Sequence, residues 1–339
     1  MKFGIFGVGS IGKRHAKNIA EMHSDSEILV WTPNKSSSDN YYKTDINEIK
    51  KIQGNIKVIY EKSEIYNSTP DLILVCTPTA FHTEYCLMSI KNNIPFFVEK
   101  PLSHKHDEAL KVANDSKKNK LNGFVGYDLR FYPLFKKIKE FIEKEELGKI
   151  YGFHASVGSY MPLWRKTDYT KIYSSRKEMG GGVVLDLSHE IDYLQYFFGK
   201  IKTVYSNPQR KSNLKIDVED YVDAILKFEN NISGTLHMDY LNKRGERNFK
   251  VIGERGTLTW DWYKHKLVIS IDGMEKEFEL KEFDVNEMYK DELKYVIENR
   301  DKKLNEKDNI ISLEKGAETV RICEKIIEGG SHELWWQEW

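Results

Sequence analysis

The sequence predicts an α/β protein with two domains, a doubly wound parallel sheet first and then an α+β domain with an open, mostly antiparallel sheet. Its 339 residues favour two domains, at about 150 residues for each. Over roughly the first 125 residues, short apolar runs alternate with helical patterns, which is typical of βαβ units. Later stretches alternate apolar and polar residues between turn residues, as antiparallel strands do. We place the domains at 1–124 and 125–330, followed by a tryptophan-rich tail at 331–339.

The first domain shows its strands as short apolar runs and its helices as longer amphipathic segments. The predicted strands lie at residues 3–6, 28–31, 72–76 and 96–98, with a weaker one around 58–59. A helix is predicted at 81–91, and the polar stretch 34–54 is interpreted as a loop and a helix. This order of elements builds a parallel sheet that is covered by helices.

The second domain begins with a strongly amphipathic helix at 133–145. Alternating stretches then predict strands at 221–228, 233–240, 248–252, 257–262, 266–271 and 275–280. Two further helices are predicted at 285–299 and 311–328. Because turn residues such as Asp272-Gly273 separate the strands, most neighbours should pair antiparallel.

The composition excludes several classes of protein. Lys plus Arg and Asp plus Glu both number 52, so no positive excess predicts a nucleic-acid or membrane partner. The chain has no run of about 18 apolar residues, which a bilayer span requires, and its apolar start is too short for a signal peptide. Cys76, Cys86 and Cys323 form neither a disulfide framework nor a metal-ligand spacing. We therefore expect a cytoplasmic protein without a metal site.

A glycine-rich turn closes the first predicted strand and opens a helix. Gly7, Gly9 and Gly12, with Ser10 and Ile11 between the last two, form the pattern G-x-G-x-x-G. In this context the glycines allow a tight turn and the close approach of a pyrophosphate to the helix N-terminus. We therefore predict a Rossmann domain with a dinucleotide site; a glycine-rich turn without a ligand is the alternative.

The end of the second predicted strand indicates which dinucleotide is bound. An acidic residue about 20 residues past the glycine motif would hold the adenosine ribose of NAD. This chain has Thr32, Asn34 and Lys35 there, followed by three serines. Because a lysine and hydroxyls could hold a 2′-phosphate, we favour NADP. The alternative is a solvated loop, with NAD bound through neutral hydrogen bonds.

Two further strand ends carry polar side chains. Thr77, Pro78 and His82 follow the strand predicted at 72–76, and Glu99-Lys100 follows the next one. A lysine at the carboxyl end of a parallel strand points into the ligand crevice of an open α/β sheet.

A triple glycine at 180–182 starts another predicted helix, with Asp186 and His189 on one face at spacing i, i+3. Together with the glycine motif and Glu99-Lys100-Pro101, it makes the chain resemble the Gfo/Idh/MocA family (glucose-fructose oxidoreductase / inositol dehydrogenase-like) over nearly its whole length. Other matching pieces are Thr77-Pro78…His82, Arg130-Phe131, Gly148-Lys149-Ile150 and Gly253–Leu258. Family members more often place the acid and the histidine four residues apart, whereas this chain has three and keeps the spacing from His189 to Asp192.

The resemblance implies hydride transfer between a sugar-like alcohol and a nicotinamide cofactor. It also implies a second domain whose open sheet commonly supports oligomers, so a homo-oligomer (dimer or tetramer) is expected. With the glycine turn and the region of Lys35, the predicted cofactor-binding residues are Gly7, Gly9, Ser10, Ile11, Gly12, Thr32, Asn34, Lys35, Thr77, Pro78, His82, Glu99 and Lys100. The implied proton chemistry falls to Lys100, Asp186 and His189.

The chemistry of alcohol oxidation suits these three residues. The reaction needs a base near neutral pH, and His189 is the predicted base because histidine titrates there. The ammonium of Lys100 can stabilise the developing alkoxide, and Asp186 orients the substrate or the histidine. Alternatively, Lys100 forms a structural ion pair with Glu99, and His189 is satisfied by Asp186 or Asp192. The side chains without such a context, interpreted as structural, are His82, His154 and His237.

The segment 160–177 is predicted to be a loop that closes over the substrate. It has five basic residues to one acid, interleaved with aromatic and hydroxyl residues. Aromatic rings stack on sugars, and arginine holds carboxylate or phosphate, so the segment predicts a sugar or sugar nucleotide, with an anionic one as an option. The predicted substrate-binding residues are Tyr127, Arg130, Trp164, Arg165, Tyr169, Tyr173, Arg176 and Tyr240. The alternatives are a solvated basic loop and a loop that wraps a neighbouring subunit.

The order of residues from Trp164 to Tyr193 also resembles a subgroup tied to bacterial surface-polysaccharide and nonulosonate (sialic-acid-like) pathways. We therefore expect an NAD(P)-dependent sugar oxidoreductase of such a pathway. Two other classes stay open: an NAD-dependent glycosidase that oxidises C3 transiently, and a non-catalytic NADP-sensing regulator. The presence of both Lys100 and His189 disfavours the regulator.

Overall fold

The computed structural model describes residues 1–33, 46–165, 167–304 and 309–334. The chain divides into two compact units. The first unit comprises Met1–Asp128, Glu178–Gly180 and Asn286–Val320, and the second comprises Leu129–Lys177, Gly181–Val285 and Arg321–Trp339. The first boundary thus lies four residues after the predicted one at 124, and the first unit also takes in a segment from the last third of the chain.

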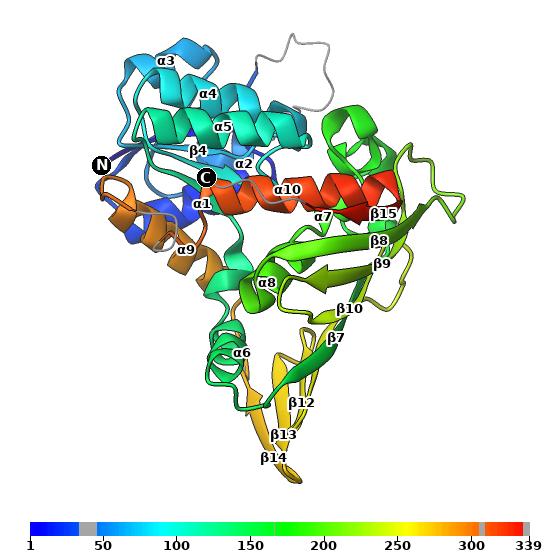
Figure 1. Ribbon diagram of the computed structural model, residues 1–339. Coiled ribbons are helices and arrows are strands. Elements are labelled where there is room, and N and C mark those ends of the chain that lie inside the picture. Colours follow the sequence, from blue (N-terminus) through cyan, green and yellow to red (C-terminus); the bar gives the residue numbers. More distant parts are fainter. Residues whose placement is uncertain (34–45, 166, 305–308, 335–339) are drawn as a thin grey trace. The chain divides into compact units, whose positions relative to one another are not determined.

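The first unit contains a six-stranded parallel sheet, which confirms the predicted doubly wound domain (Figure 1). Its strands are β1 (Lys2–Phe6), β2 (Glu27–Trp31), β3 (Asn55–Ile59), β4 (Leu72–Val75), β5 (Phe96–Glu99) and β6 (Gly123–Gly126). Their order is β3-β2-β1-β4-β5-β6, so the winding direction reverses between β1 and β4. Ligands of such sheets bind outside the carboxyl ends of the strands at this reversal.

Helices cover the strands because the central strands are almost entirely apolar, with residues 3–6 of β1 and all four residues of β4 buried. The helices are α1 (Ser10–Met22), α2 (Ile46–Lys50), α3 (Lys62–Asn67), α4 (His82–Lys91), α5 (His106–Lys118), α9 (Asn286–Asn299) and the start of α10 (Leu313–Glu328). Helices α4 and α5 lie side by side, and α9 packs against α1 (Figure 1). The backbone at Ile311 accepts a hydrogen bond from Val125 N at 2.9 Å, so this late segment covers the edge strand β6.

The second unit contains a nine-stranded sheet in the order β14-β13-β12-β11-β7-β10-β9-β8-β15. Its strands are β7 (Ile150–Gly158), β8 (Ile201–Gln209), β9 (Tyr221–Phe228), β10 (Ser233–Asp239), β11 (Glu246–Gly253), β12 (Gly256–Asp261), β13 (Lys266–Ile271), β14 (Met274–Glu279) and β15 (Gly330–Glu333). All neighbours pair antiparallel except β7 and β10, which confirms the mostly antiparallel sheet.

One face of this sheet forms the core of the second unit. Helices α6 (Pro133–Glu143) and α8 (His189–Phe198) supply aromatic side chains to it, and α7 (Val183–Asp186) supplies aliphatic ones. The ring of Phe135 lies 5.0 Å from Tyr193 and 4.7 Å from Trp260 in edge-to-face contacts. The opposite face carries exposed apolar side chains, with Ile225 50% and Tyr205 48% accessible.

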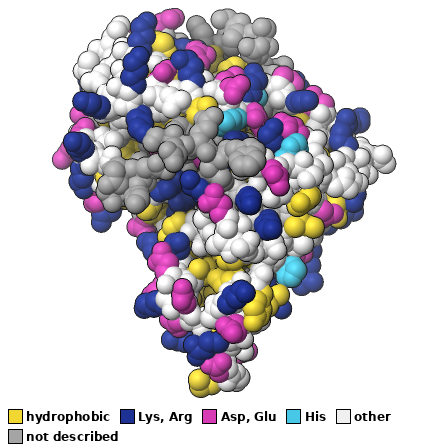
Figure 2. Space-filling model, viewed as in Figure 1, with side chains coloured by type: hydrophobic (Ala, Val, Ile, Leu, Met, Phe, Trp, Pro, Cys, Tyr) yellow, Lys and Arg dark blue, Asp and Glu magenta, His cyan; other side chains and the backbone are white. Residues whose placement is uncertain are grey.

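In the described part of the chain, no helix combines the length and the apolar character that a bilayer crossing demands. Lys and Arg side chains are interspersed with Asp and Glu over the face shown in Figure 2.

Candidate functional site

The turn after β1 has the geometry that a dinucleotide requires. A Cβ added to Gly7, whose φ is +91°, would lie 2.6 Å from the backbone of Cys76, and one added to Gly12 would lie 2.0 Å from the Gly7 carbonyl oxygen. These two glycines therefore serve the packing of the turn itself. A Cβ at Gly9 would meet no described atom within 4 Å, which leaves room for a ligand.

Helix α1 begins after this turn with an N-terminus that suits an anion. Its N-cap is Gly9, which has no side chain to accept from the first N–H groups, and the first turn contains no acid. Ser10 and Ile11 are the first two helical residues. A pyrophosphate would satisfy these N–H groups and is favoured by the positive end of the helix dipole.

The loop after β4, the neighbour of β1, adds a buried hydroxyl to this cradle. Thr77 is 6% exposed, and its Oγ1 has no hydrogen-bond partner among the described residues. Leaving such a group unpaired costs about 1–3 kcal/mol, so a bound ligand would stabilise it. Pro78 follows and caps a short 3₁₀ turn. The residues present thus fit a nicotinamide dinucleotide.

His82 connects this loop to the residue after Lys100. Its Nδ1 lies 2.9 Å from the Pro101 carbonyl oxygen and its Nε2 lies 2.8 Å from that of Thr77. Burial lowers the pKa of this ring, and the neutral ring donates to one carbonyl at a time. His82 therefore holds the two strand ends together.

Glu99 and Lys100 lie at the carboxyl end of β5. The carboxylate of Glu99 is hydrogen-bonded to His15 Nε2 at 2.6 Å, and His15 is a fully buried residue of α1. The acid of the Glu-Lys-Pro motif is thereby tied to the helix that would hold the pyrophosphate. Lys100 follows directly and is partly exposed.

Of the residues that are predicted to bind the adenosine ribose, the structure describes only Thr32. Thr32 is buried directly after β2, and its N–H donates to the Ile59 carbonyl at 3.2 Å. Asn34 and Lys35 lie outside the described residues.

In the second unit, the triple glycine leads into two short helices instead of the single one predicted. Helix α7 ends at Asp186, Leu187 leaves helical geometry at φ −100° and ψ 25°, and α8 begins at His189. The prediction that both side chains lie on one helix is therefore wrong. Helix α7 is a single turn, and the Val184 N–H at its start donates to the Glu219 carboxyl at 3.1 Å.

Asp186 lies in a buried polar contact. It is 8% exposed and accepts a hydrogen bond of 2.6 Å from the hydroxyl of Tyr240, which is fully buried. Burial, and next the charge of Asp186, raises the pKa of Tyr240 well above its ordinary value, so this hydroxyl is a donor. The ring of Trp164 lies 5.0 Å from that of Tyr240 at 88°, and His189 is partly exposed three residues after Asp186. The structure thus brings three of the predicted residues, Asp186, Tyr240 and Trp164, into one cluster.

The predicted substrate loop packs on the triple glycine. Gly181 N donates to the Arg176 carbonyl at 2.9 Å, and Gly182 N donates to that of Ser174 at 3.1 Å. The guanidinium of Arg165 lies 5.8 Å from the ring centre of Tyr173. The hydroxyl of Tyr169 accepts from Lys215 N at 3.3 Å.

Arg130 and Tyr127, the other two predicted substrate ligands, are buried. Arg130 donates to both oxygens of Asp192, at 2.9 Å and 2.7 Å, and both side chains are less than 5% exposed. The guanidinium thus pairs with Asp192, the carboxylate that was predicted as an alternative partner of His189. Tyr127 is 1% exposed and follows β6 directly.

Sequence reasoning missed one residue of this cluster, Glu219. Burial raises the pKa of its carboxyl to about 7; the bond from Val184 opposes the shift and the charge of Asp186 adds to it. Glu219 lies in a polar stretch without a motif, 33 residues from Asp186, so no signal in the sequence identifies it.

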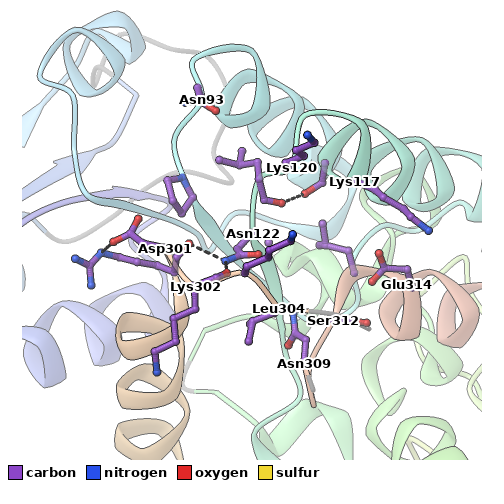
Figure 3. Close-up of a pocket in the computed structure, with 17 residues that line it drawn as sticks. Asn93, Lys117, Lys120, Asn122, Asp301, Lys302, Leu304, Asn309, Ser312 and Glu314 are labelled. Carbon is purple, nitrogen blue, oxygen red and sulfur yellow. Dashed lines mark hydrogen bonds and ion pairs between the residues drawn. The ribbon is translucent and has the colours of Figure 1, made fainter. Parts of the chain in front are cut away.

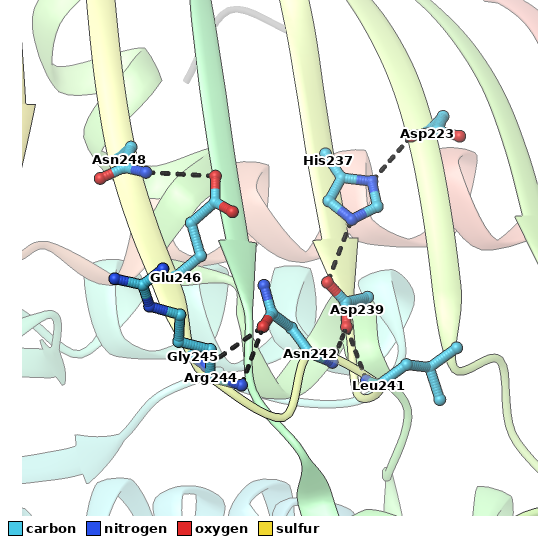
Figure 4. A network of polar contacts seen from close by, with 9 residues as sticks. All are labelled: Asp223, His237, Asp239, Leu241, Asn242, Arg244, Gly245, Glu246 and Asn248. Carbon is cyan, nitrogen blue, oxygen red and sulfur yellow. Dashed lines mark hydrogen bonds and ion pairs between the residues drawn. The ribbon is translucent and has the colours of Figure 1, made fainter.

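Two other features lie apart from these clusters. A cavity of about 860 Å³ lies at the amino ends of β5 and β6, the sheet edge opposite the glycine turn (Figure 3). There the side-chain nitrogen of Asn122 lies within hydrogen-bond distance of three carbonyl oxygens of the 299–302 turn, which share its two N–H groups. On the second sheet, His237 lies between Asp223 at 2.7 Å and Asp239 at 3.1 Å (Figure 4).

Comparison with known proteins relates both parts of the chain to characterised ones. Residues 1–127 match the model of an oxidoreductase family with an NAD-binding Rossmann fold, and residues 135–259 match the GFO/IDH/MocA C-terminal domain. The chain is 26% identical over 279 residues to the myo-inositol 2-dehydrogenase of Thermotoga maritima, covering 80% of this chain and 78% of that protein. It is 21% identical over 283 residues to the 2,7-anhydro-N-acetylneuraminate hydratase of Escherichia coli, covering 82% and 72%. The crystal structure of the WlbA dehydrogenase of Bordetella pertussis, in complex with NADH and UDP-GlcNAcA, matches with a TM-score of 0.78 at 18% identity and covers 99% of both chains.

Proposed function

Because the chain belongs to the GFO/IDH/MocA family of NAD-binding oxidoreductases, we propose that it transfers hydride between nicotinamide and a hydroxyl or ketone of a sugar or sugar nucleotide. The observation that carries the proposal is the buried Asp186–Tyr240 hydrogen bond of 2.6 Å, three residues from His189. A fixed carboxylate can orient an alcohol, and a histidine next to it can accept the proton of that alcohol.

Each group has a role in this proposal. His189 accepts the hydroxyl proton, Asp186 orients the alcohol, and the Lys100 ammonium stabilises the developing negative oxygen. The nicotinamide, when bound, supplies the hydride acceptor or donor. Thr77 and the glycine turn hold the cofactor, and the hydrogen bond between Glu99 and His15 fixes the strand end that carries Lys100.

The substrate loop supports a sugar substrate with an anionic group. Trp164 and Tyr240 present aromatic surface, and Arg165 and Arg176 add positive charge within 12 residues of each other. The relatives named for myo-inositol and for 2,7-anhydro-N-acetylneuraminate, and the WlbA complex with UDP-GlcNAcA, agree with this class. We place the enzyme in surface-polysaccharide or nonulosonate metabolism on the same grounds, with residues 125–330 as the substrate domain.

For the cofactor we retain the NADP preference that the Lys35 region predicts. Titration of the protein with NADH and with NADPH, followed by nicotinamide fluorescence, tests this. A clear preference for NADH would reject it. We also propose a homo-oligomer formed through the exposed face of the second sheet, where Ile225 and Tyr205 lie; the mass measured in solution tests this.

The function itself is tested by a screen of free sugars, sugar acids and nucleotide sugars for absorbance change at the nicotinamide band. Lys100→Ala and His189→Ala should each lower kcat strongly while cofactor binding persists, because their groups act on the substrate oxygen. Lys91→Ala, an exposed lysine at the end of α4, is the matched control. Turnover near that of the wild type in either site variant would contradict the assignment.

The same screen separates the two alternatives. An NAD-dependent glycosidase would release an aglycone without net NADH, and an NADP-sensing regulator would bind cofactor without turnover of any sugar. Steady accumulation of reduced cofactor would exclude both.

A further inference from the structure

Glu219 is built into the turn that carries Asp186. Its side chain accepts from Val184 N at 3.1 Å, and its backbone carbonyl accepts from Val183 N at 3.2 Å. A Cβ at Gly182, whose φ is +120°, would lie 2.4 Å from the Glu219 Oε1. The third glycine of the motif is therefore required for this carboxyl to reach the backbone.

The segment around Glu219 also contacts the other parts of the cluster. Asp217 accepts from Lys177 N at 2.7 Å, and the Asp220 carbonyl accepts from Tyr240 N at 2.9 Å. Residues 217–220 thus join the substrate loop, the helix α7 and Tyr240. A shift of Glu219 would move the backbone on both sides of the Asp186–Tyr240 bond.

The protonation state of Glu219 changes the net charge next to Asp186. Asp186 is the acidic neighbour, Tyr240 is hydrogen-bonded to that acid, and Lys177 is the basic neighbour. Two carboxyls that share a buried site do not both ionise readily. Ionised Glu219 adds a negative charge next to Asp186, where an anionic substrate would bind, whereas protonated Glu219 does not.

We propose that Glu219 is a positioning residue of the reaction: through its hydrogen bond from Val184 N, its carboxyl holds the turn that carries Asp186. In its protonated form this carboxyl adds no second negative charge to the substrate site. The inference rests on the proposed function. It concerns a residue that the Lys100, Asp186 and His189 assignment does not include.

One test does not depend on activity. The carboxyl has a pKa of about 7 in the fold against 4.5 as its ordinary value, so between these values the folded chain keeps a proton that the unfolded chain loses. Stability must therefore fall as pH rises through this window. The Glu219→Gln variant has no carboxyl that titrates at this position. The difference obtained by subtracting the wild-type Tm from the Tm of the variant should therefore increase from pH 4.5 to pH 7.5. The exposed Glu229→Gln is the matched control and should parallel the wild type.

The second test is kinetic, with Glu219→Gln and Glu219→Ala assayed from pH 6 to 9. The alanine variant should lose about tenfold in kcat/KM through the missing bond to Val184. The glutamine variant, which can still accept from Val184 N, should match the wild type near pH 6 and exceed it above pH 7.5. Wild-type pH profiles of Tm and kcat/KM in both variants would overturn the proposal. If the wild type itself turns over no sugar, the proposed function fails, and the Tm comparison still decides whether Glu219 holds this proton.

Discussion

Replacing Gly9 by alanine should weaken cofactor binding and leave the fold almost unchanged. Gly9 has φ −66° and ψ −166°, which alanine adopts without strain, and its added Cβ would meet nothing described within 4 Å. The methyl group would instead occupy the space in which a pyrophosphate approaches the start of α1. Gly12→Ala is the contrasting variant, because its Cβ would lie 2.0 Å from the Gly7 carbonyl oxygen.

The two magnitudes can be worked out separately. At an N-cap, alanine costs up to about 1 kcal/mol relative to glycine, which lowers Tm by about 1–2 °C in a chain of this size. Loss of one hydrogen bond to a charged phosphate costs about 1.5–3 kcal/mol, which raises the Kd for NADH or NADPH roughly 10- to 150-fold. Gly12→Ala should lose clearly more stability than Gly9→Ala, because backbone atoms must move.

Thermal unfolding and fluorescence titration with both cofactors measure the two effects. The Gly9 variant should have a Tm near that of the wild type and a weakened affinity for the cofactor. The Gly12 variant should have both a lower Tm and a weakened affinity. Wild-type affinity in the Gly9 variant would show that no pyrophosphate lies against this turn, and the reasoning from its geometry would be refuted.

Three further predictions concern the second unit. Tyr240→Phe removes the donor to Asp186 and should lower kcat/KM about 10- to 100-fold, since a hydrogen bond to a charged group contributes about 1.5–3 kcal/mol; unchanged turnover would contradict this. Arg130→Met removes the guanidinium that pairs with the buried Asp192 and should cost about 3–5 kcal/mol in urea unfolding, whereas loss of a substrate ligand would affect KM with little loss of stability. The pKa of His237 is raised, chiefly by its hydrogen bonds to two carboxylates, so its stabilisation is complete below about pH 6.5 and is lost as pH rises through the higher folded value. The Tm difference between the wild type and His237→Gln should accordingly shrink from pH 5.5 to pH 8.5, and a constant difference would reject this role.

The strands that alternate clearly in the sequence were predictable, and others were not. β9 and β13 have the predicted bounds, and the residues of β9 alternate between buried and accessible. β7 and β8 were not predicted. β7 has an alanine at 155, a core-facing position where a larger apolar residue would reveal the alternation, and β8 contains a proline. Their strand character depends on neighbouring strands that are remote in the sequence.

The candidate site divides in the same way. The glycine turn, Lys100, Asp186 and His189 were identifiable because short motifs mark them. Glu219 was not, because its bond to Val184 joins residues 35 positions apart. The break at Leu187 was not predictable either, because residues 183–198 contain no glycine or proline that would mark the end of a helix.

The late segment that completes the first unit has a consequence for how the protein is made. Helix α9 packs on α1, and the backbone at Ile311 covers the edge strand β6, so residues 1–128 alone would leave an apolar helix face and a strand edge open. A ribosome synthesises the whole second sheet, except β15, before it reaches these residues. The cofactor-binding unit, although it starts first, can therefore close only when nearly the entire chain has emerged.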